Sequence, residues 1–270
     1  DFMTYASVSK GFKSGGFDQR RVLLTDASLI NGGNDEAGEF DEEEALSYEL
    51  GWKSTLMEGR VTFNGTFYFV DYDNFQAQAF DGASTKVTNA GSLQSYGSEI
   101  DLTFAASANL TLGTAIGYNK AEYKEFDGGQ CTATDTFFAF QIDPTVPCVV
   151  DLAGKPLDNA PELTFSSYAQ YERSLDNDLL IIARAEHNYI DSFYLDQDLD
   201  AKLYNDKVDL INLRVTLANE NRDWEVALWG KNVLDEKHYI MGIDIPTVGG
   251  YAGVVAERAT YGLTLRRSFQ

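Results

Sequence analysis

The stretch Val61-Thr62-Phe63-Asn64-Gly65-Thr66-Phe67-Tyr68-Phe69 alternates residue by residue between two kinds of side chain. Its odd positions are apolar or glycine, and its even positions are Thr, Asn, Thr and Tyr. Successive side chains of a β-strand point to opposite faces, so this period of two predicts a strand with one apolar and one polar face. The same alternation recurs at 99–104, 110–117 and 211–217 and in the last strand, 259–269.

The alternation predicts about ten strands along the chain. They lie near 2–12, 44–57, 60–78, 91–106, 110–126, 162–175, 179–195, 207–218, 223–233 and 259–269. The connections alternate in length. Short turns are expected near 57–60, 107–109, 175–178 and 218–222, and longer loops near 13–43, 79–90, 127–161, 196–206 and 234–258.

Short turns at one end and long loops at the other are typical of an antiparallel transmembrane β-barrel. Several predicted strands exceed ten residues, as a tilted strand needs to cross a bilayer. A soluble β-sandwich also alternates, but its strands are typically about 5–6 residues long. No apolar stretch of the roughly 20 residues that a transmembrane helix needs is present. The sequence therefore favours the barrel.

The polar face of the predicted strands carries charges of both signs. The residues expected to face the barrel lumen are Glu49, Lys53, Glu99, Asp101, Arg184, Glu186, Arg214, Glu225, Lys231 and Arg266. Small barrels fill their interior with side chains, whereas barrels of about 22 strands enclose a plugged lumen. So many inward charges favour a wide lumen; the alternative is that they pair inside a smaller barrel. Because the chain starts within a strand at Asp1, we expect it to be the C-terminal part of a larger barrel.

Composition excludes several classes of protein. Acidic residues outnumber basic ones 42 to 21, and the formal net charge is −21. A nucleic-acid-binding protein would need a basic face, so no nucleic-acid partner is expected. With two Cys and two His, the chain offers little for a Cys/His zinc site, and no metal or cofactor is predicted.

Several segments, in order along the chain, resemble TonB-dependent outer-membrane receptors. They are Tyr5-Ala6-Ser7-Val8-Ser9-Lys10-Gly11-Phe12-Lys13-Ser14-Gly15-Gly16-Phe17, Tyr48-Glu49-Leu50-Gly51-Trp52-Lys53-Ser54, Phe67-Tyr68-Phe69-Val70-Asp71-Tyr72, Asn89-Ala90-Gly91 with Tyr96-Gly97-Ser98-Glu99, Gly230-Lys231-Asn232-Val233-Leu234-Asp235-Glu236-Lys237-His238-Tyr239, and the terminal segment Leu263 to Phe269. The combination is specific, although no single motif is.

The resemblance implies a bacterial outer-membrane receptor that is not an enzyme. It implies that residues 1–270 are the C-terminal ten strands of a barrel of about 22 strands, with the plug domain and earlier strands outside this sequence. The partners implied are outer-membrane lipid and lipopolysaccharide, the inner-membrane TonB complex acting through the plug, and a scarce nutrient, most often a ferric siderophore. Phe269 corresponds to the family's terminal aromatic barrel-assembly signal, although Gln270 follows it here.

The long loop 127–161 holds two candidate features. Cys131 and Cys148 are expected to form a disulfide, because export passes through the oxidising periplasm. Such a bond would stabilise the fold by roughly 3 kcal/mol through loop entropy. Phe137, Phe138 and Phe140 could contact a ligand or pack within the loop.

Other candidates favour structural roles. Asp196, Asp198 and Asp200 could hold a hard cation, but they lack the glycine and closing glutamate of a calcium loop, so a solvated acidic loop is expected. His187 and His238 have no Ser, Cys or Asp beside them by spacing, and both are interpreted as structural. The alternatives to a transporter are a stand-alone channel and a small-barrel outer-membrane hydrolase that uses one of these histidines.

Overall fold

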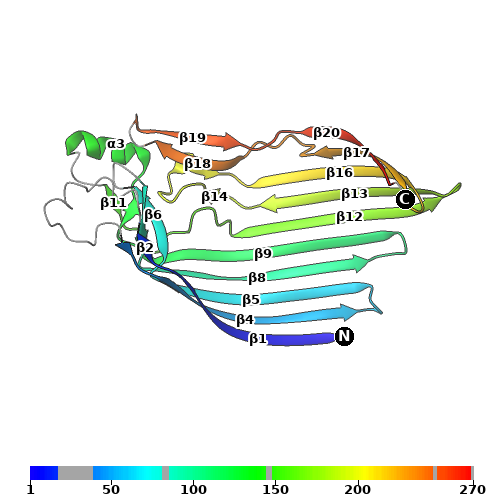
Figure 1. Ribbon diagram of the computed structural model, residues 1–270, viewed down its shortest axis with the longest axis horizontal. Helices are drawn as coiled ribbons and strands as arrows, with labels where there is room; N and C mark the ends of the chain where they lie inside the picture. Colours follow the sequence, from blue (N-terminus) through cyan, green and yellow to red (C-terminus); the bar gives the residue numbers. More distant parts are fainter. Residues whose placement is uncertain (18–38, 81–84, 144–147, 246–247, 269–270) are drawn as a thin grey trace.

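The computed structural model describes residues 1–17, 39–80, 85–143, 148–245 and 248–268. Its main feature is one ten-stranded sheet in which every neighbouring pair is antiparallel (Figure 1). In spatial order the strands are β1 (Phe2–Lys13), β4 (Glu43–Leu56), β5 (Val61–Asp73), β8 (Ser92–Ala105), β9 (Leu110–Glu125), β12 (Leu163–Leu175), β13 (Leu179–Ile190), β16 (Val208–Asn219), β17 (Trp224–Lys231) and β20 (Thr260–Arg267). Each corresponds to one predicted strand, so the prediction of ten antiparallel strands is confirmed.

Two predicted strands run too far. The strand expected over 60–78 ends at Asp73, because Asn74 adopts a positive φ of 53° and donates its N–H to the carbonyl of Gly91. The strand expected over 179–195 ends at Ile190, where the Asp191 carboxylate accepts the N–H of Ser192 at 2.8 Å. Such local bonds by short polar side chains compete with the sheet ladder.

The long-loop end carries small elements of its own (Figure 1). These are the pairs β2 (Gly16–Phe17) with β3 (Glu39–Phe40), β6 (Gln76–Phe80) with β7 (Thr85–Asn89), β10 (Gly129–Gln130) with β11 (Val149–Val150), β14 (Phe193–Tyr194) with β15 (Tyr204–Asn205) and β18 (Tyr239–Ile245) with β19 (Gly250–Val255), together with helix α3 (Ala133–Ile142) and the short 3-10 helix η1 (Ala201–Leu203). No helix within the described ranges is long and apolar enough to cross a membrane.

The short turns lie at the opposite end, as predicted. Met57 and Glu58 have φ values of 53° and 57°, and Asn177 and Asp178 have values of 63° and 56°. Two consecutive residues with positive φ are characteristic of the tight turns whose twist matches that of a hairpin. Strand β1 begins and strand β20 ends toward this end of the sheet (Figure 1).

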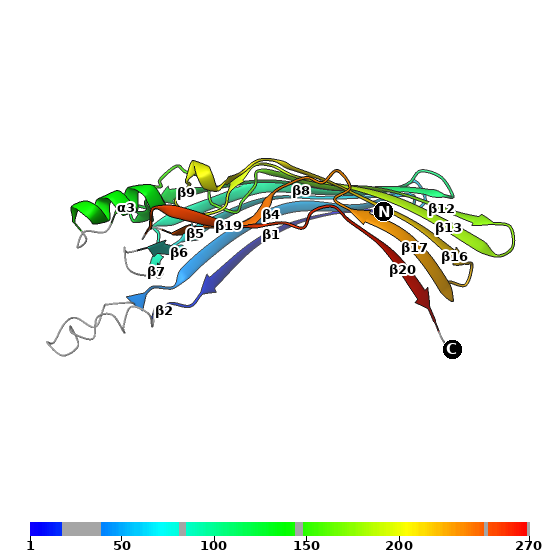
Figure 2. The same ribbon diagram turned by 90° about the horizontal axis from the view of Figure 1, so that it is seen from above.

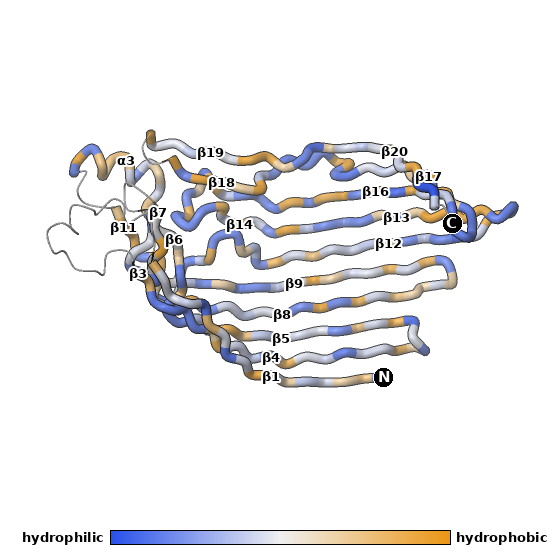
Figure 3. Tube along the Cα trace, viewed as in Figure 1, coloured by the Kyte–Doolittle hydropathy of each residue, from blue (hydrophilic) through white to orange (hydrophobic). Residues whose placement is uncertain are grey.

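The sheet is curved and open, and its edge strands β1 and β20 bend toward the same side (Figure 2). Hydrophobic and hydrophilic residues are interspersed along the strands (Figure 3). One face exposes large apolar side chains over many strands, among them Val8, Leu50, Phe67, Leu213, Val215, Leu228, Leu263 and Leu265. No second sheet packs on this face within the described residues, so the sandwich alternative is wrong. An apolar band of this extent suits contact with lipid.

Glycines paired with aromatic residues recur along the sheet. In each case the ring lies directly opposite the glycine on the neighbouring strand, where a Cβ on the glycine would come within 2.2 to 2.5 Å of it. The four pairs are Gly51 with Tyr5, Gly65 with Trp52, Gly113 with Tyr168 and Gly262 with Trp229. The aromatic ring covers the backbone that the glycine leaves bare, a device that pins strand register.

Replacing Gly113 by Ala in the full-length protein should lower its free energy of unfolding by about 1–3 kcal/mol, the usual cost of overpacking. A Cβ there would lie 2.2 Å from Cε1 of Tyr168, so the ring must move. Denaturant unfolding of the detergent-solubilised protein measures the change. Gly117→Ala is the matched control on the same face of the same strand, because its nearest neighbour is the Thr164 hydroxyl at 3.1 Å. Equal stability of the two variants would contradict the packing role of Tyr168.

Candidate functional site

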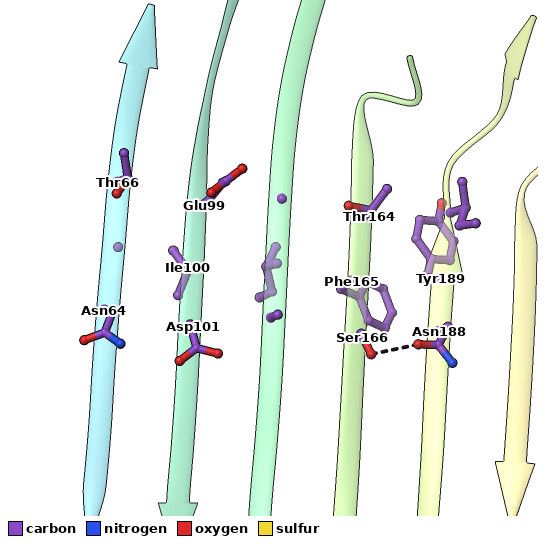
Figure 4. A pocket seen from close by; sticks show the side chains of 15 residues that line it. Asn64, Thr66, Glu99, Ile100, Asp101, Thr164, Phe165, Ser166, Asn188 and Tyr189 are labelled. Atoms are coloured by element: carbon purple, nitrogen blue, oxygen red, sulfur yellow. Dashed lines mark hydrogen bonds between the residues drawn. The ribbon is translucent and has the colours of Figure 1, made fainter. Parts of the chain in front are cut away.

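A groove of about 730 Å³ crosses the middle of the sheet on its polar face (Figure 4). Five strands contribute to it, β5, β8, β9, β12 and β13. Its polar groups include Asn64, Thr66, Glu99 and Asp101, and on the far side Ser166 donates to the Asn188 side chain at 2.7 Å. The sheet is curved, and a groove lined by five neighbouring strands forms on the inner side of such a curve. The polar face is therefore the concave face of the sheet. The groove can therefore offer carboxylates, hydroxyls and amides to whatever occupies the concavity.

Strand register places all eight of the charges Glu49, Lys53, Glu99, Asp101, Arg184, Glu186, Arg214 and Arg266 on this concave face. They do not form one cluster. Glu49 accepts a hydrogen bond from Ser7 at 3.3 Å, and Arg266 lies 4.0 Å from Glu225. Their role as lumen-lining residues stays a prediction.

Arg184 is the most connected of these charges. Its guanidinium pairs with Glu186 at 2.6 Å and donates to the Gln170 side chain at 3.1 Å. The guanidinium carbon also lies 4.0 Å from the centre of the Tyr168 ring, the ring that covers Gly113. The contact with Tyr168 is a feature that alternation did not reveal, because it depends on cross-strand register.

The loops fold back onto the concave face at the long-loop end. Leu93 and Tyr123, on strands β8 and β9, are 2% and 0% exposed. Phe126 and Leu152 pack against them, and the N–H of Leu152 bonds to the carbonyl of Phe126 at 2.9 Å. This small core also includes Ala77, Ala90, Tyr72, Phe75, Leu157 and Leu199. The loops thus pack on the concave face of the ten-stranded sheet, which forms the wall of the barrel, in addition to being joined to its strands.

Cys131 and Cys148 are bonded to each other, with their Cα atoms 5.7 Å apart. The disulfide closes the segment that contains α3, a helix that the sequence analysis did not predict. The helix begins after Thr132, whose hydroxyl accepts the N–H of Asp135. Thr is a preferred N-cap residue, and Asp135 follows Thr132 by three positions, so the start of α3 could have been predicted from the sequence.

The three phenylalanines of this helix differ in their surroundings. Phe138 and Phe140 are exposed, at 61% and 50%. Phe137 is half-buried and packs close to Gly249, with the Phe138 ring centre 5.8 Å away. The structure thus separates one packing residue from two that are free to contact a ligand. Phe269, the expected assembly signal, lies outside the described residues.

The expectation of a solvated loop at Asp196, Asp198 and Asp200 is wrong. Asp198 and Asp200 are only 6% and 8% exposed. The reason is that the loop packs under the β18–β19 hairpin, where Asp244 joins Asp196 and Asp198. The sequence around residues 196–200 does not indicate this burial, because Asp244 lies in β18, far along the chain.

The two histidines lie in different surroundings. His187 lies on the apolar face, with its ring edge-on to Phe165 and its Nε2 2.9 Å from an Asp209 oxygen. Spacing along the chain did not indicate this neighbour, because Asp209 comes from the adjacent strand β16. Ser167, opposite His187, instead shares a hydrogen bond with Thr114. His238 has a buried Nδ1 without a hydrogen-bond partner in the described part of the chain, and burial lowers its pKa.

Comparison with known families identifies the protein family of this chain. Residues 1–233 match the family model described as TonB dependent receptor-like, beta-barrel. The chain belongs to the TonB-dependent receptor family. Its ten strands are accordingly the C-terminal portion of a TonB-dependent receptor barrel, a protein of the outer membrane.

Solved structures share the fold at low sequence identity. The ferric yersiniabactin uptake receptor FyuA of Yersinia pestis superimposes with a TM-score of 0.74 at 15% identity, covering 100% of this chain and 35% of that one. The siderophore receptor PiuA of Acinetobacter baumannii gives 0.67 at 16%, covering 98% and 33%. The ferric-catecholate import receptor Fiu of E. coli gives 0.60 at 20%, covering 88% and 29%. The chain thus spans about a third of the length of these receptors.

Reducing the disulfide should loosen α3 and leave the sheet intact. Without the bond, the base of this segment is held by the two-residue pair β10–β11 and by the packing of Phe126 and Leu152, while α3 loses its covalent link. Hydrogen exchange of the α3 amides should accelerate at least about tenfold in a Cys131→Ala/Cys148→Ala receptor, since the bond is worth roughly 3 kcal/mol in loop entropy. The amides of β9 and β12 serve as the internal reference. Unchanged exchange in α3 would show that packing alone holds the helix.

Proposed function

We propose that the full-length receptor captures a ferric siderophore with its extracellular loops and imports it by TonB-energised active transport. The observation that carries this proposal is the family match over residues 1–233. It is supported by the folds of the uptake receptors that the chain resembles, which are named for siderophore ligands.

The edges of the sheet support a larger barrel. Among the residues that the structure describes, strands β1 and β20 each have a neighbour on one side only. Within a bilayer an open edge leaves backbone groups unpaired, so further strands must close the sheet. We propose that these strands, and a plug that fills the lumen and reaches the TonB complex, come from the rest of the receptor. The concave groove and its charges would then face the plug.

The loop segment closed by the disulfide is the best candidate for ligand contact in this chain. Its helix presents Phe138 and Phe140 to solvent, while Phe126 and Leu152 anchor its base to the wall. An anchored base with exposed aromatic rings gives a ligand apolar contact area at little cost in ordering the loop. The ferric siderophore is proposed as the ligand, bound without any covalent chemistry.

Uptake of radiolabelled iron by iron-starved cells tests the function directly. Cells that carry the receptor should accumulate iron from at least one siderophore of a panel, and loss of TonB should abolish that uptake. Uptake that persists without TonB would instead support a passive channel. If this segment alone gave stable pore conductance, the stand-alone barrel would be favoured.

Replacing residues 131–148 by a short Gly-Ser linker should weaken siderophore binding at least about tenfold, or about 1.4 kcal/mol. The exchange keeps Phe126 and Leu152, so the barrel should still fold and keep its heat-modifiable mobility in gels. Binding is measured by titration of the purified receptor. Unchanged affinity would remove this loop from the binding surface.

A finer test separates the three phenylalanines. The Phe138→Ala/Phe140→Ala receptor should lose affinity without losing stability, because both rings are exposed. Phe137→Ala is the matched control. It should mainly destabilise the helix, because Phe137 packs against Gly249. If Phe137→Ala alone lowered affinity, the rings would act through packing and not through contact with ligand.

A further inference from the structure

Three carboxylates from two loops meet beneath the extracellular surface. Asp196 and Asp198 follow β14, and Asp244 lies in β18. One carboxylate oxygen from each lies within 4.8 Å of the other two. Asp198 is 6% exposed, while Asp196 and Asp244 are half-buried. Carboxylates placed this close repel one another and lose hydration, so something must balance their charge.

The two loops are held together firmly at this point. Asn205 donates its side-chain N–H to the carbonyl of Tyr239 at 2.9 Å, and its oxygen accepts the N–H of Tyr239 at 3.3 Å. Leu195 and Leu203 pack so closely on Gly242 that a Cβ there would lie 3.0 Å from each. The carboxylates are therefore positioned by the packing of the loops around them.

Several oxygens of the cluster are left without partners. Asp196 accepts the N–H groups of Gln197 and Asp244, and Asp198 Oδ1 accepts that of Asp200 at 3.1 Å. Within the described ranges, Asp198 Oδ2 and both carboxylate oxygens of Asp244 are buried without a hydrogen-bond partner. Asp198 is more than nine-tenths buried, and this unpartnered oxygen belongs to one of three carboxylates gathered at one point.

Neighbouring cations do not neutralise the cluster. None of the three carboxylates forms an ion pair with Lys or Arg in the part of the chain that the structure describes. The ammonium group of the nearby Lys202 lies over the Tyr251 ring, 4.9 Å from the centre, and attracts Asp244 without forming an ion pair with it. One cation at this position cannot neutralise three carboxylates. The charge must be balanced in another way.

We propose that Asp196, Asp198 and Asp244 bind a calcium ion that fastens the 196–205 loop to the β18–β19 hairpin. Ca²⁺ takes carboxylate and carbonyl oxygens in irregular, flexible geometries, whereas Mg²⁺ demands a near-ideal octahedron. The side-chain oxygen of Gln197, also buried without a partner in the described residues, is a further neutral oxygen in the same loop.

The competing way to balance the charge is a proton. Burial raises the pKa of both the Asp198 and the Asp244 carboxyl, so without a cation one of them retains a proton at higher pH than usual. The two alternatives respond differently to calcium. A bound cation displaces the proton, so binding should tighten as pH rises.

Calcium titration of the chelator-stripped full-length receptor in detergent tests the site. The expected result is saturable binding with a Kd of about 10⁻⁴–10⁻³ M, the range of extracellular modules. Asp198→Asn and Asp244→Asn should each weaken it at least tenfold. Asp206→Asn is the matched control, because Asp206 is exposed and directly follows the 196–205 loop. Mg²⁺ at the same concentration should not substitute.

Three outcomes would overturn the proposal. One is the absence of saturable binding, and another is equal affinity in the wild type, the two cluster variants and Asp206→Asn. The third is Asp198→Asn raising stability at neutral pH with calcium having no effect, as a shared proton predicts. Should a cluster variant not fold, the wild type still decides. Hydrogen exchange at 196–205 and 239–245 must slow when calcium is added, and a lack of protection would also refute the site.

Discussion

The structure depends on the need to pair every backbone N–H and C=O group of a strand that crosses a bilayer. Lipid offers no hydrogen bonds, so the pairs must be made between neighbouring strands. The strands are accordingly long, reaching 16 residues in β9, and each follows its sequence neighbour in space. Tight turns at one end keep that register. With the ladder fixed, strict alternation assigns one face to lipid and one to the concave interior.

Register also determines which side chains meet on the concave face. Tyr168 lies opposite Gly113 and covers it, and Arg184 in turn lies over the Tyr168 ring and pairs with Glu186. Packing and charge are therefore coupled at this point, and a partly exposed pair such as Arg184 with Glu186 contributes position more than net stability. The same face carries the groove around Glu99 and Asp101, where the sheet presents polar side chains to the concave interior.

The long loops pack on the concave face of the sheet and continue it beyond the ends of the strands. Leu93 and Tyr123 belong to strands, while Phe126 and Leu152 belong to the loop that packs on them. Above this small core, the disulfide and α3 present aromatic side chains, and the 196–205 loop lies under the β18–β19 hairpin. The loops can thus hold a binding surface in place, since their bases are fixed by apolar burial and their tips remain accessible.

The sequence by itself determined the strands, the short turns and the apolar and polar faces, because these are encoded locally with a period of two. The family was indicated separately, by the resemblance of several segments along the chain. The sequence also indicated the cysteine pair, and Thr132 with Asp135 could have indicated the start of α3. It did not locate the breaks at Asn74 and Asp191. Only the tertiary structure decided that Asp244 joins Asp196 and Asp198, that Phe137 packs while Phe138 and Phe140 do not, and that Tyr168 links Gly113 to Arg184. These contacts join residues far apart in the chain, and their geometry depends on strand register and on how the loops fold over the wall, which no local pattern specifies.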